Sequence, residues 1–166
     1  MTRPRVVLVG PPGAGKTTVG RLLAAALGVP FRDTDADVEA LVGKTIADVF
    51  FDEGEESFRA HERAAVAAAL EAHQGVLSLG GGAVLAEETR ALLRGHAVIF
   101  LSVGLADAAR RVGLSRDRPV LALNPRATLL TLLEERLPLY RDVATVEIAT
   151  DGRSPEDVAR EALSSL

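Results

Sequence analysis

The feature that most constrains this chain is a glycine-rich loop that begins at Gly10 and ends at Thr17. Its sequence, GPPGAGKT, matches the pattern G-x-x-x-x-G-K-[ST] without a gap. The β-branched apolar run Val6–Val9 precedes it, and Thr17–Leu27, which has helical apolar spacing, follows it. This strand–loop–helix order predicts backbone N–H groups that surround phosphate oxygens at a helix N-terminus. A simple glycine turn would not require Lys16 and Thr17 in register.

The side chains at the end of this loop have separate roles in phosphate binding. Lys16 can reach the β- and γ-phosphates of a nucleotide, and the Thr17 hydroxyl can ligate Mg²⁺, a cation that prefers oxygen. We therefore expect ATP to bind, with Mg²⁺, at the loop residues Gly13, Ala14, Gly15, Lys16, Thr17 and Thr18. Such a loop does not by itself distinguish a small-molecule kinase from a GTPase or a motor.

Strand patterns alternate with helical patterns along the whole chain. The predicted strands are Val6–Val9, Phe31–Asp35, Val76–Leu79, Ala97–Leu101 and Thr145–Ala149. The predicted helices are Thr17–Leu27, Asp37–Val42, Ile46–Phe51, Glu55–His73, Glu87–Arg94, Ala106–Val112, Arg126–Leu139 and Pro155–Leu166. This alternation is typical of an α/β fold with helices on both faces of a parallel sheet. With 166 residues and no repeat or linker, we expect a single domain, 1–166.

Composition argues against several other classes of protein. Cysteine is absent, which excludes disulfides, thiolate metal sites and a cysteine nucleophile. The net charge of −4 argues against a general nucleic-acid-binding protein. The first apolar run is too short for a signal peptide, and no stretch approaches the roughly 20 apolar residues of a membrane span. We expect a cytoplasmic monomer that acts on small molecules and binds neither nucleic acid nor a membrane.

Two carboxylates follow the second predicted strand, in the run Asp33-Thr34-Asp35. Ligands of open α/β sheets bind beyond the carboxyl ends of the strands. One carboxylate could hold a water bound to Mg²⁺, and the other could accept a proton from an attacking hydroxyl. The alternative is that either aspartate simply caps the helical segment that follows.

Three glycines, Gly80, Gly81 and Gly82, directly follow the third predicted strand. They indicate backbone that approaches a ligand closely, although a sharp turn between strand and helix is the alternative. Arg59 and Arg136 lie inside predicted helices. Each could bind a carboxylate or phosphate with two hydrogen bonds, or could lie on a solvated helix face.

The longest irregular stretch of the chain, Gly113–Pro125, is a candidate lid. Arg116 and Arg118 flank Asp117 within it. An arginine brought to the phosphates when such a lid closes could neutralise phosphoryl charge. We predict this role for Arg118 and assign none to Arg116.

Taken together, these motifs resemble those of the shikimate kinases, which belong to the nucleoside-monophosphate-kinase-like group of phosphate-loop proteins. The resemblance covers essentially the whole chain. Beyond the phosphate loop it rests on five short motifs in a specific order. They are D-T-D at 33–35, F-R at 58–59, L-G-G-G-A at 79–83, R-P at 118–119 and R-x-P-L-Y-R at 136–141.

The resemblance implies a fold, a reaction and a pathway. The implied fold is a three-layer kinase fold whose five parallel strands lie in the order 2-3-1-4-5, with a substrate-binding region at about 34–62 and a short lid at about 113–125. The implied reaction transfers the γ-phosphoryl group of ATP to the 3-hydroxyl of shikimate. This step belongs to the chorismate route to aromatic amino acids.

The resemblance also implies roles at the acceptor end. Asp35 would bind the ring hydroxyls of shikimate and is the candidate base for the 3-hydroxyl. Arg59 and Arg136 would hold the carboxylate. The glycine run would lie beside them with the Gly81 backbone nearest, and two aromatic side chains would wall the pocket; these residues are Gly80, Gly81, Gly82, Phe50 and Phe58.

At the nucleotide end, the resemblance places Mg²⁺ between Thr17 and Asp33, the latter acting through water. Arg118 would be the lid arginine that reaches the phosphates of ATP. The adenine would be framed by Arg111, Arg153 and Pro155. Lys16, Asp35 and Arg118 are thus the expected catalytic residues.

One departure and two rival functions remain at this point. Arg118-Pro119 is followed by Val120-Leu121, where the family usually has two leucines. A gluconate or nucleoside-monophosphate kinase is the closest rival, but the D-G-[FY]-P-R run of adenylate-kinase-like enzymes is absent. A GTPase-like switch would need a base-reading N-K-x-D run, which is also absent.

Overall fold

The computed structural model describes residues 3–112 and 125–166. Five parallel strands form one sheet in the order β2-β3-β1-β4-β5. The strands are β1 (Val6–Val9), β2 (Phe31–Asp33), β3 (Val76–Ser78), β4 (Val98–Ser102) and β5 (Val146–Ala149). In the central strand, Val7 lies between Leu77 of β3 and Val98 of β4. The predicted α/β fold and strand order are therefore confirmed.

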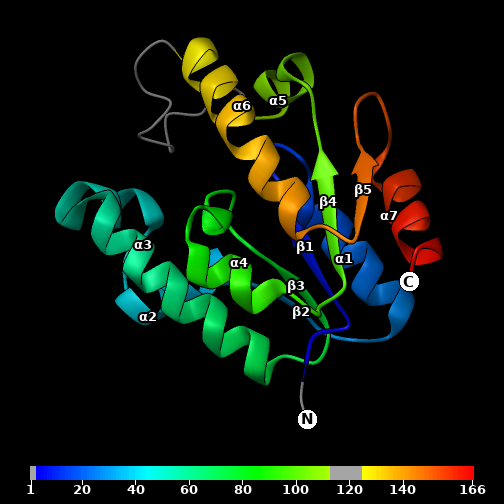
Figure 1. Ribbon diagram of the computed structural model, residues 1–166, viewed down its shortest axis with the longest axis horizontal. Coiled ribbons are helices and arrows are strands. Elements are labelled where there is room, and N and C mark those ends of the chain that lie inside the picture. The colour runs from blue at the N-terminus through cyan, green and yellow to red at the C-terminus, as the bar shows by residue number, and fades with distance from the viewer. Residues whose placement is uncertain (1–2, 113–124) are drawn as a thin grey trace.

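Helices connect consecutive strands and cover both faces of the sheet (Figure 1). They are α1 (Lys16–Leu27), α2 (Thr34–Val42), α3 (Ile46–Ala72), α4 (Glu87–Leu93), α5 (Leu105–Val112), α6 (Pro125–Val143) and α7 (Pro155–Ser164), with a 3₁₀ turn, η1, at Ala83–Leu85. Helices α1 and α7 pack on one face, and α3, α4 and most of α6 pack on the other. Within 3–112 and 125–166, no helix is long and apolar enough to cross a membrane.

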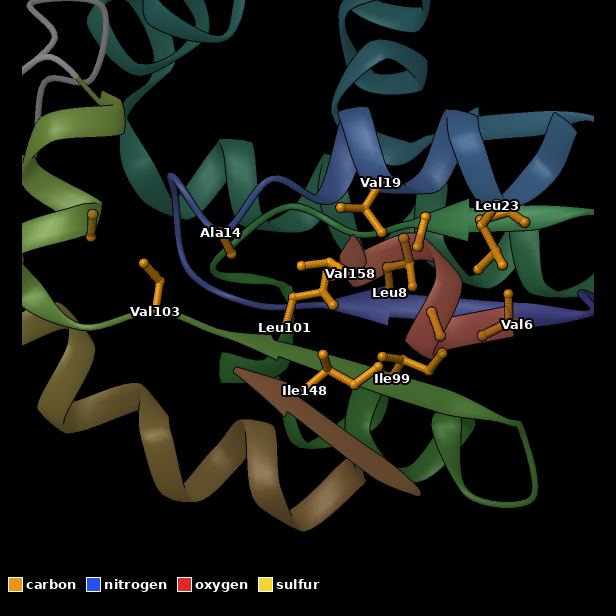
Figure 2. Close-up of a cluster of buried hydrophobic side chains, with 14 of the residues drawn as sticks. Val6, Leu8, Ala14, Val19, Leu23, Ile99, Leu101, Val103, Ile148 and Val158 are labelled. Carbon is orange, nitrogen blue, oxygen red and sulfur yellow. The ribbon is translucent and has the colours of Figure 1, made fainter. Parts of the chain in front are cut away.

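The continuous apolar run of β1 is explained by burial on both faces of the sheet. Side chains alternate along a strand, so Val6 and Leu8 face α1 and α7, while Val7 and Val9 face the opposite layer. Figure 2 shows Leu8 below Val19 of α1 and Val6 below Leu23. All four β1 side chains are at most 1% exposed. Burying each contributes about 1.5–3 kcal/mol, which anchors the strand that leads into the glycine-rich loop.

Several predicted boundaries differ from the structure, and three of the differences have a clear local reason. Strand β2 ends at Asp33, not Asp35, because the Asp33 carboxylate accepts the Asp35 N–H at 2.8 Å and caps α2. The two helices predicted on either side of Gly54 form one element with a break at that residue, whose φ is 87°. Helix α6 continues through Pro138 to Val143, because its last turns are buried against the sheet.

Candidate active site

The glycine-rich loop leads directly from β1 into the first turn of α1. Gly15 occupies the N-cap position with φ 90° and provides no side-chain cap, so the first N–H groups of α1 are available to a ligand. The Lys16 ammonium group folds back over the loop and donates to the carbonyl oxygens of Gly10 at 2.7 Å and Pro11 at 3.1 Å. The arrangement is a concave, positively polarised surface suited to phosphate groups.

A pocket of about 550 Å³ lies above this loop, at the carboxyl ends of β1, β2 and β3. It brings together residues from the loop, β2, the glycine run, α5 and the start of α7. Its lining residues are Pro12, Gly13, Gly15, Lys16, Thr17, Thr18, Asp33, Asp35, Ser78, Leu79, Gly80, Gly81, Arg111, Arg153 and Pro155. Most of the sequence-predicted ATP-binding residues among those described therefore share one cavity, as do both aspartates.

Thr17 and Asp33 meet inside this pocket. The Thr17 hydroxyl lies 3.4 Å from Oδ2 of Asp33, while Oδ1 of Asp33 accepts the Asp35 N–H. One carboxylate therefore caps α2 and also faces the hydroxyl. Both groups are hard oxygen donors and fit Mg²⁺, which retains several waters and needs few protein ligands. The described residues contain no cluster of three or more His, Cys, Asp or Glu that could hold a metal, so the placement of Mg²⁺ at Thr17 and Asp33 stays a prediction.

The far wall of the pocket is formed by Arg111, Arg153 and Pro155. Arg111 donates to the Gly13 carbonyl at 3.2 Å, which places it beside the phosphate loop. Arg153 donates to the Ala149 carbonyl at 3.0 Å and pairs with Glu161 at 2.8 Å. Pro155 is the first residue of α7, as its sequence position indicates. These three residues come from two segments that are far apart in sequence.

A second group of charged residues lies behind the glycine run. Arg59 and Glu62 are three residues apart on α3 and form an ion pair at 2.9 Å, and Arg59 also pairs with Glu55 at 3.3 Å. A methyl group placed on Gly82 would overlap the Arg59 guanidinium. One placed on Gly80 would lie 2.5 Å from Asp35 Oδ1 and 2.8 Å from Glu62 Oε2. Gly80 and Gly82 thus allow charged side chains to approach the backbone closely, and the close approach of this run to a ligand stays a prediction.

Helix α6 contributes Arg136 and Tyr140 to the same group of residues behind the glycine run. They lie one turn apart on the same helix, and burial, which raises the pKa of Tyr140, is opposed by the nearby Arg136 guanidinium, which acts to lower it. Both are buried, with exposed fractions of 6% and 1%. The Tyr140 hydroxyl donates to the Gly81 carbonyl at 2.5 Å, which fixes the glycine run against α6.

Burial changes the ionisation of this cluster. It raises the pKa of Tyr140 to about 12, so the phenol remains a hydrogen-bond donor. It also raises the pKa of Glu62 above its ordinary value, against the opposing effect of Arg59. Glu62 Oε2 and Arg59 Nε are buried without a hydrogen-bond partner. Unsatisfied polar atoms of this kind in one cluster are what a polar ligand or water would satisfy.

Two groups of predicted residues remain outside this arrangement. The rings of Phe50 and Phe58 are in contact, with centroids 4.9 Å apart and planes tilted by 32°, and Phe58 belongs to a small apolar core between α2 and α3. Neither ring lines the 550 Å³ pocket, so their role as substrate walls stays a prediction. Arg118 and the proposed lid, apart from Pro125 at the start of α6, lie outside the described residues.

Two buried residues of the cluster were not predicted from sequence. Glu62 carried a signal in its i,i+3 spacing from Arg59, which places both on one helix face. Tyr140, the only tyrosine of the chain, lies within the R-x-P-L-Y-R motif but received no role of its own. Their partners Gly80 and Gly81 lie in a different element, and only the folded chain reveals that contact.

Comparison with known proteins decides the family. A family model for shikimate kinase matches residues 12–166. The chain belongs to the shikimate kinase family. The shikimate kinase of Salinispora tropica is 64% identical over 163 residues, which is 98% of each chain. Membership in this family makes the chain a kinase that uses ATP.

Solved structures agree with this family at the level of the fold. A shikimate kinase from Acinetobacter baumannii in complex with shikimate superposes with a TM-score of 0.94 at 37% identity, covering 99% of this chain and 93% of that one. A gluconokinase from Sinorhizobium meliloti has a TM-score of 0.57 at 21% identity, covering 98% of this chain and 90% of that one, which indicates a shared fold alone. The gluconate kinase considered as a rival is therefore a relative in architecture.

Proposed function

We propose that the protein transfers the γ-phosphoryl group of ATP to the 3-hydroxyl of shikimate and forms shikimate 3-phosphate, a step in chorismate biosynthesis. The observation that carries the proposal is the position of Asp35. It lines the pocket above the phosphate loop, and its carboxylate also meets Glu62 across Gly80. A carboxylate between a phosphate-binding loop and a cluster that contains two arginines suits an acceptor that has hydroxyls at one end and an anion at the other.

At the nucleotide end, the proposed ligand groups are the loop N–H groups and Lys16. The carbonyl oxygens that now accept from Lys16 are neutral, so a β- or γ-phosphate oxygen would be a stronger partner for its ammonium group. Thr17 and Asp33 would hold Mg²⁺, which when bound neutralises phosphate charge. Arg111, Arg153 and Pro155 would frame the adenine, and Arg118 would reach the phosphates from the lid.

At the acceptor end, Arg59 and Arg136 are proposed to bind the shikimate carboxylate beside the Gly81 backbone. Both side chains already belong to a buried cluster, so little rotamer entropy is lost when the ligand binds. Asp35 would accept the proton of the 3-hydroxyl as its oxygen bonds to the γ-phosphorus. The bond from that phosphorus to the bridging oxygen then breaks, and ADP leaves with the electron pair.

Phosphoryl transfer depends mainly on positioning and charge neutralisation. All residues assigned to the two ends belong to this chain, so the reaction needs no partner subunit, and we propose that the protein acts as a monomer in the cytoplasm. The absence of a membrane-spanning helix among the described residues is compatible with that setting.

The proposal is tested by coupled ADP release with shikimate, quinate, gluconate and a nucleoside monophosphate as acceptors. We expect shikimate-dependent release that exceeds release with any other acceptor by at least about a hundredfold in kcat/KM. A nucleoside monophosphate has no carboxylate for the two arginines, and an acceptor with a different carbon skeleton does not place its hydroxyl correctly when its carboxylate is bound. Gluconate and quinate also carry a carboxylate, but on a carbon skeleton that differs from that of shikimate. They therefore test whether the site recognises the shikimate ring. Equal rates with gluconate would overturn the proposed substrate and leave the kinase assignment intact.

A further inference from the structure

Two segments face each other across the nucleotide end of the pocket, namely α5 and the loop that joins β5 to α7. The Gly152 N–H in that loop donates to Asp107 Oδ2 of α5 at 2.8 Å. In the opposite direction, the Gly104 N–H just before α5 donates to Asp151, with both carboxylate oxygens at 3.0 Å. Each segment therefore supplies a carboxylate that accepts a backbone N–H of the other.

Arg111 lies within this crossed pair of contacts. Its guanidinium donates to the Thr150 hydroxyl at 2.9 Å and to the Thr150 carbonyl at 2.7 Å, in addition to Gly13. Its Nη2 also lies 3.5 Å from Asp107 Oδ2. Thr150 is itself 2% exposed and bonded to the Ser102 carbonyl at 2.8 Å. The orientation of Arg111 therefore depends on the loop being held where it is.

The contact of Asp107 with the loop differs from an ordinary surface ion pair. Its i,i+3 pair with Arg110 involves an exposed arginine, a type of pair that contributes little. The Asp107 carboxylate itself is only 15% exposed, and the Gly152 N–H is the main cause of its lowered pKa. A charged acceptor on a backbone N–H is among the stronger hydrogen bonds.

We propose that Asp107 and Asp151 are positioning residues that hold Arg111 and the Arg153–Pro155 segment at a fixed separation across the pocket, and thereby set the affinity for the nucleotide. Neither aspartate lines the pocket, so both act through the residues that do. Because these two sides of the pocket are already held at the separation that binding needs, less conformational entropy is lost when the nucleotide binds. The assignment of the ligand as an adenine nucleotide rests on the proposed function.

The experiment measures the Kd of ADP by calorimetry and the KM values of ATP and shikimate for Asp107→Ala and Asp151→Ala. We expect the ADP Kd and the ATP KM to rise by about tenfold, the value of one lost hydrogen bond to a charged group. The shikimate KM stays within about twofold of wild type, because the acceptor cluster is built from α2, α3 and α6. Asp107→Asn retains an oxygen for the Gly152 N–H and restores most of the affinity.

The matched control is Asp157→Ala. Asp157 forms the same kind of i,i+3 pair, with Arg160 at 2.8 Å, but lies on α7 outside the pocket. Its removal leaves the ADP Kd unchanged. Because Asp107 is argued to act partly through Arg111, the double variant Asp107→Ala/Arg111→Ala binds ADP less weakly than the sum of the single effects predicts.

Several results would overturn the proposal. They are an unchanged ADP Kd in folded Asp107→Ala and Asp151→Ala, an equal rise in the KM of both substrates, or strict additivity with Arg111→Ala. If Asp107→Ala does not fold, the ADP Kd of Asp151→Ala tests the proposal instead, since Asp151 lies on an exposed loop. Wild-type protein that binds ADP but does not phosphorylate shikimate would contradict the proposed function and leave this inference standing. Wild-type protein that does not bind ADP would contradict both.

Discussion

At the nucleotide end of the pocket, binding groups are mostly backbone N–H groups and arginines whose donors bond to carbonyl oxygens, as Arg111 and Arg153 do. At the acceptor end, by contrast, the groups are charged side chains buried against one another. Glu62 is 3% exposed and Arg136 is 6% exposed. At the first end, charged side chains bond mainly to neutral backbone carbonyls, whereas at the second end charged side chains are buried next to one another.

This difference has an energetic consequence. Removing one donor at the nucleotide end leaves neutral carbonyl oxygens, not a charge, without that partner. Removing one partner at the acceptor end leaves an uncompensated buried charge, which costs several kcal/mol. Variants at the nucleotide end should therefore change activity more than stability, whereas some variants at the acceptor end should change both.

The largest expected effect is the loss of turnover in Lys16→Met. The ammonium group donates to two neutral carbonyls, and it is the proposed partner of the transferred phosphate. We expect kcat to fall by at least about a thousandfold with the fold intact. Steady-state rates and far-ultraviolet circular dichroism check the two parts. Near-normal turnover would refute the role of the loop.

A second large effect is expected on stability in Glu62→Ala. This change removes the carboxylate that pairs with Arg59 and lowers the free energy of unfolding by about 3 kcal/mol, as measured by urea denaturation. The control is Glu147→Ala, which removes an exposed pair with Arg141 and changes stability by less than about 1 kcal/mol. If the two variants lose equal stability, the contrast between the ends is wrong.

Intermediate effects are expected for Arg59→Ala and Arg136→Ala. Each removes one proposed partner of the shikimate carboxylate, which typically costs about 2–5 kcal/mol. The KM of shikimate rises by at least an order of magnitude, whereas the KM of ATP changes little. Initial rates with each substrate varied in turn provide the measurement. A rise confined to ATP would place the acceptor elsewhere.

The smallest effects concern pH, and they have opposite signs at the two ends. Glu62 faces Arg59, Asp35 and Arg136, and burial raises its pKa above the ordinary 4.5. The folded state therefore binds this proton more tightly than the unfolded state does. Its contribution to stability is greatest below pH 4.5 and decreases as the pH rises through the raised pKa.

Asp107 behaves in the opposite way. The Gly152 N–H, with help from Arg110 and Arg111, lowers its pKa below the ordinary 3.8. The contribution of Asp107 to the stability of the folded state is therefore complete above pH 3.8 and is lost as the pH falls through the lowered pKa. The free energy of unfolding should be measured by denaturation between pH 3 and 7. We expect Glu62→Gln to remove its pH dependence on the less acidic side of this range and Asp107→Asn to remove its pH dependence on the acidic side. Identical profiles for the two variants would contradict this assignment.

Local patterns predicted the fold well because each element carries its own signal. The apolar run at Val6–Val9 requires burial on two faces, and Gly54 marks the break in α3 because its φ of 87° suits glycine. The end of β2 was placed too late because the capping hydrogen bond of Asp33 competes with strand propensity. The continuation of α6 beyond Leu139 depends on burial, which periodicity does not measure.

The sequence by itself determined the phosphate loop, the alternation of strands and helices, and the residue types of the site, because these depend on neighbours in the chain. Only the tertiary structure decided that Glu62 meets Asp35 across Gly80, that Tyr140 bonds to Gly81 59 residues away, and that Asp107 holds Gly152 45 residues away. Such pairs form where parallel strands and their helices converge. Their spacing in sequence reflects loop lengths rather than chemistry, so no local pattern encodes them.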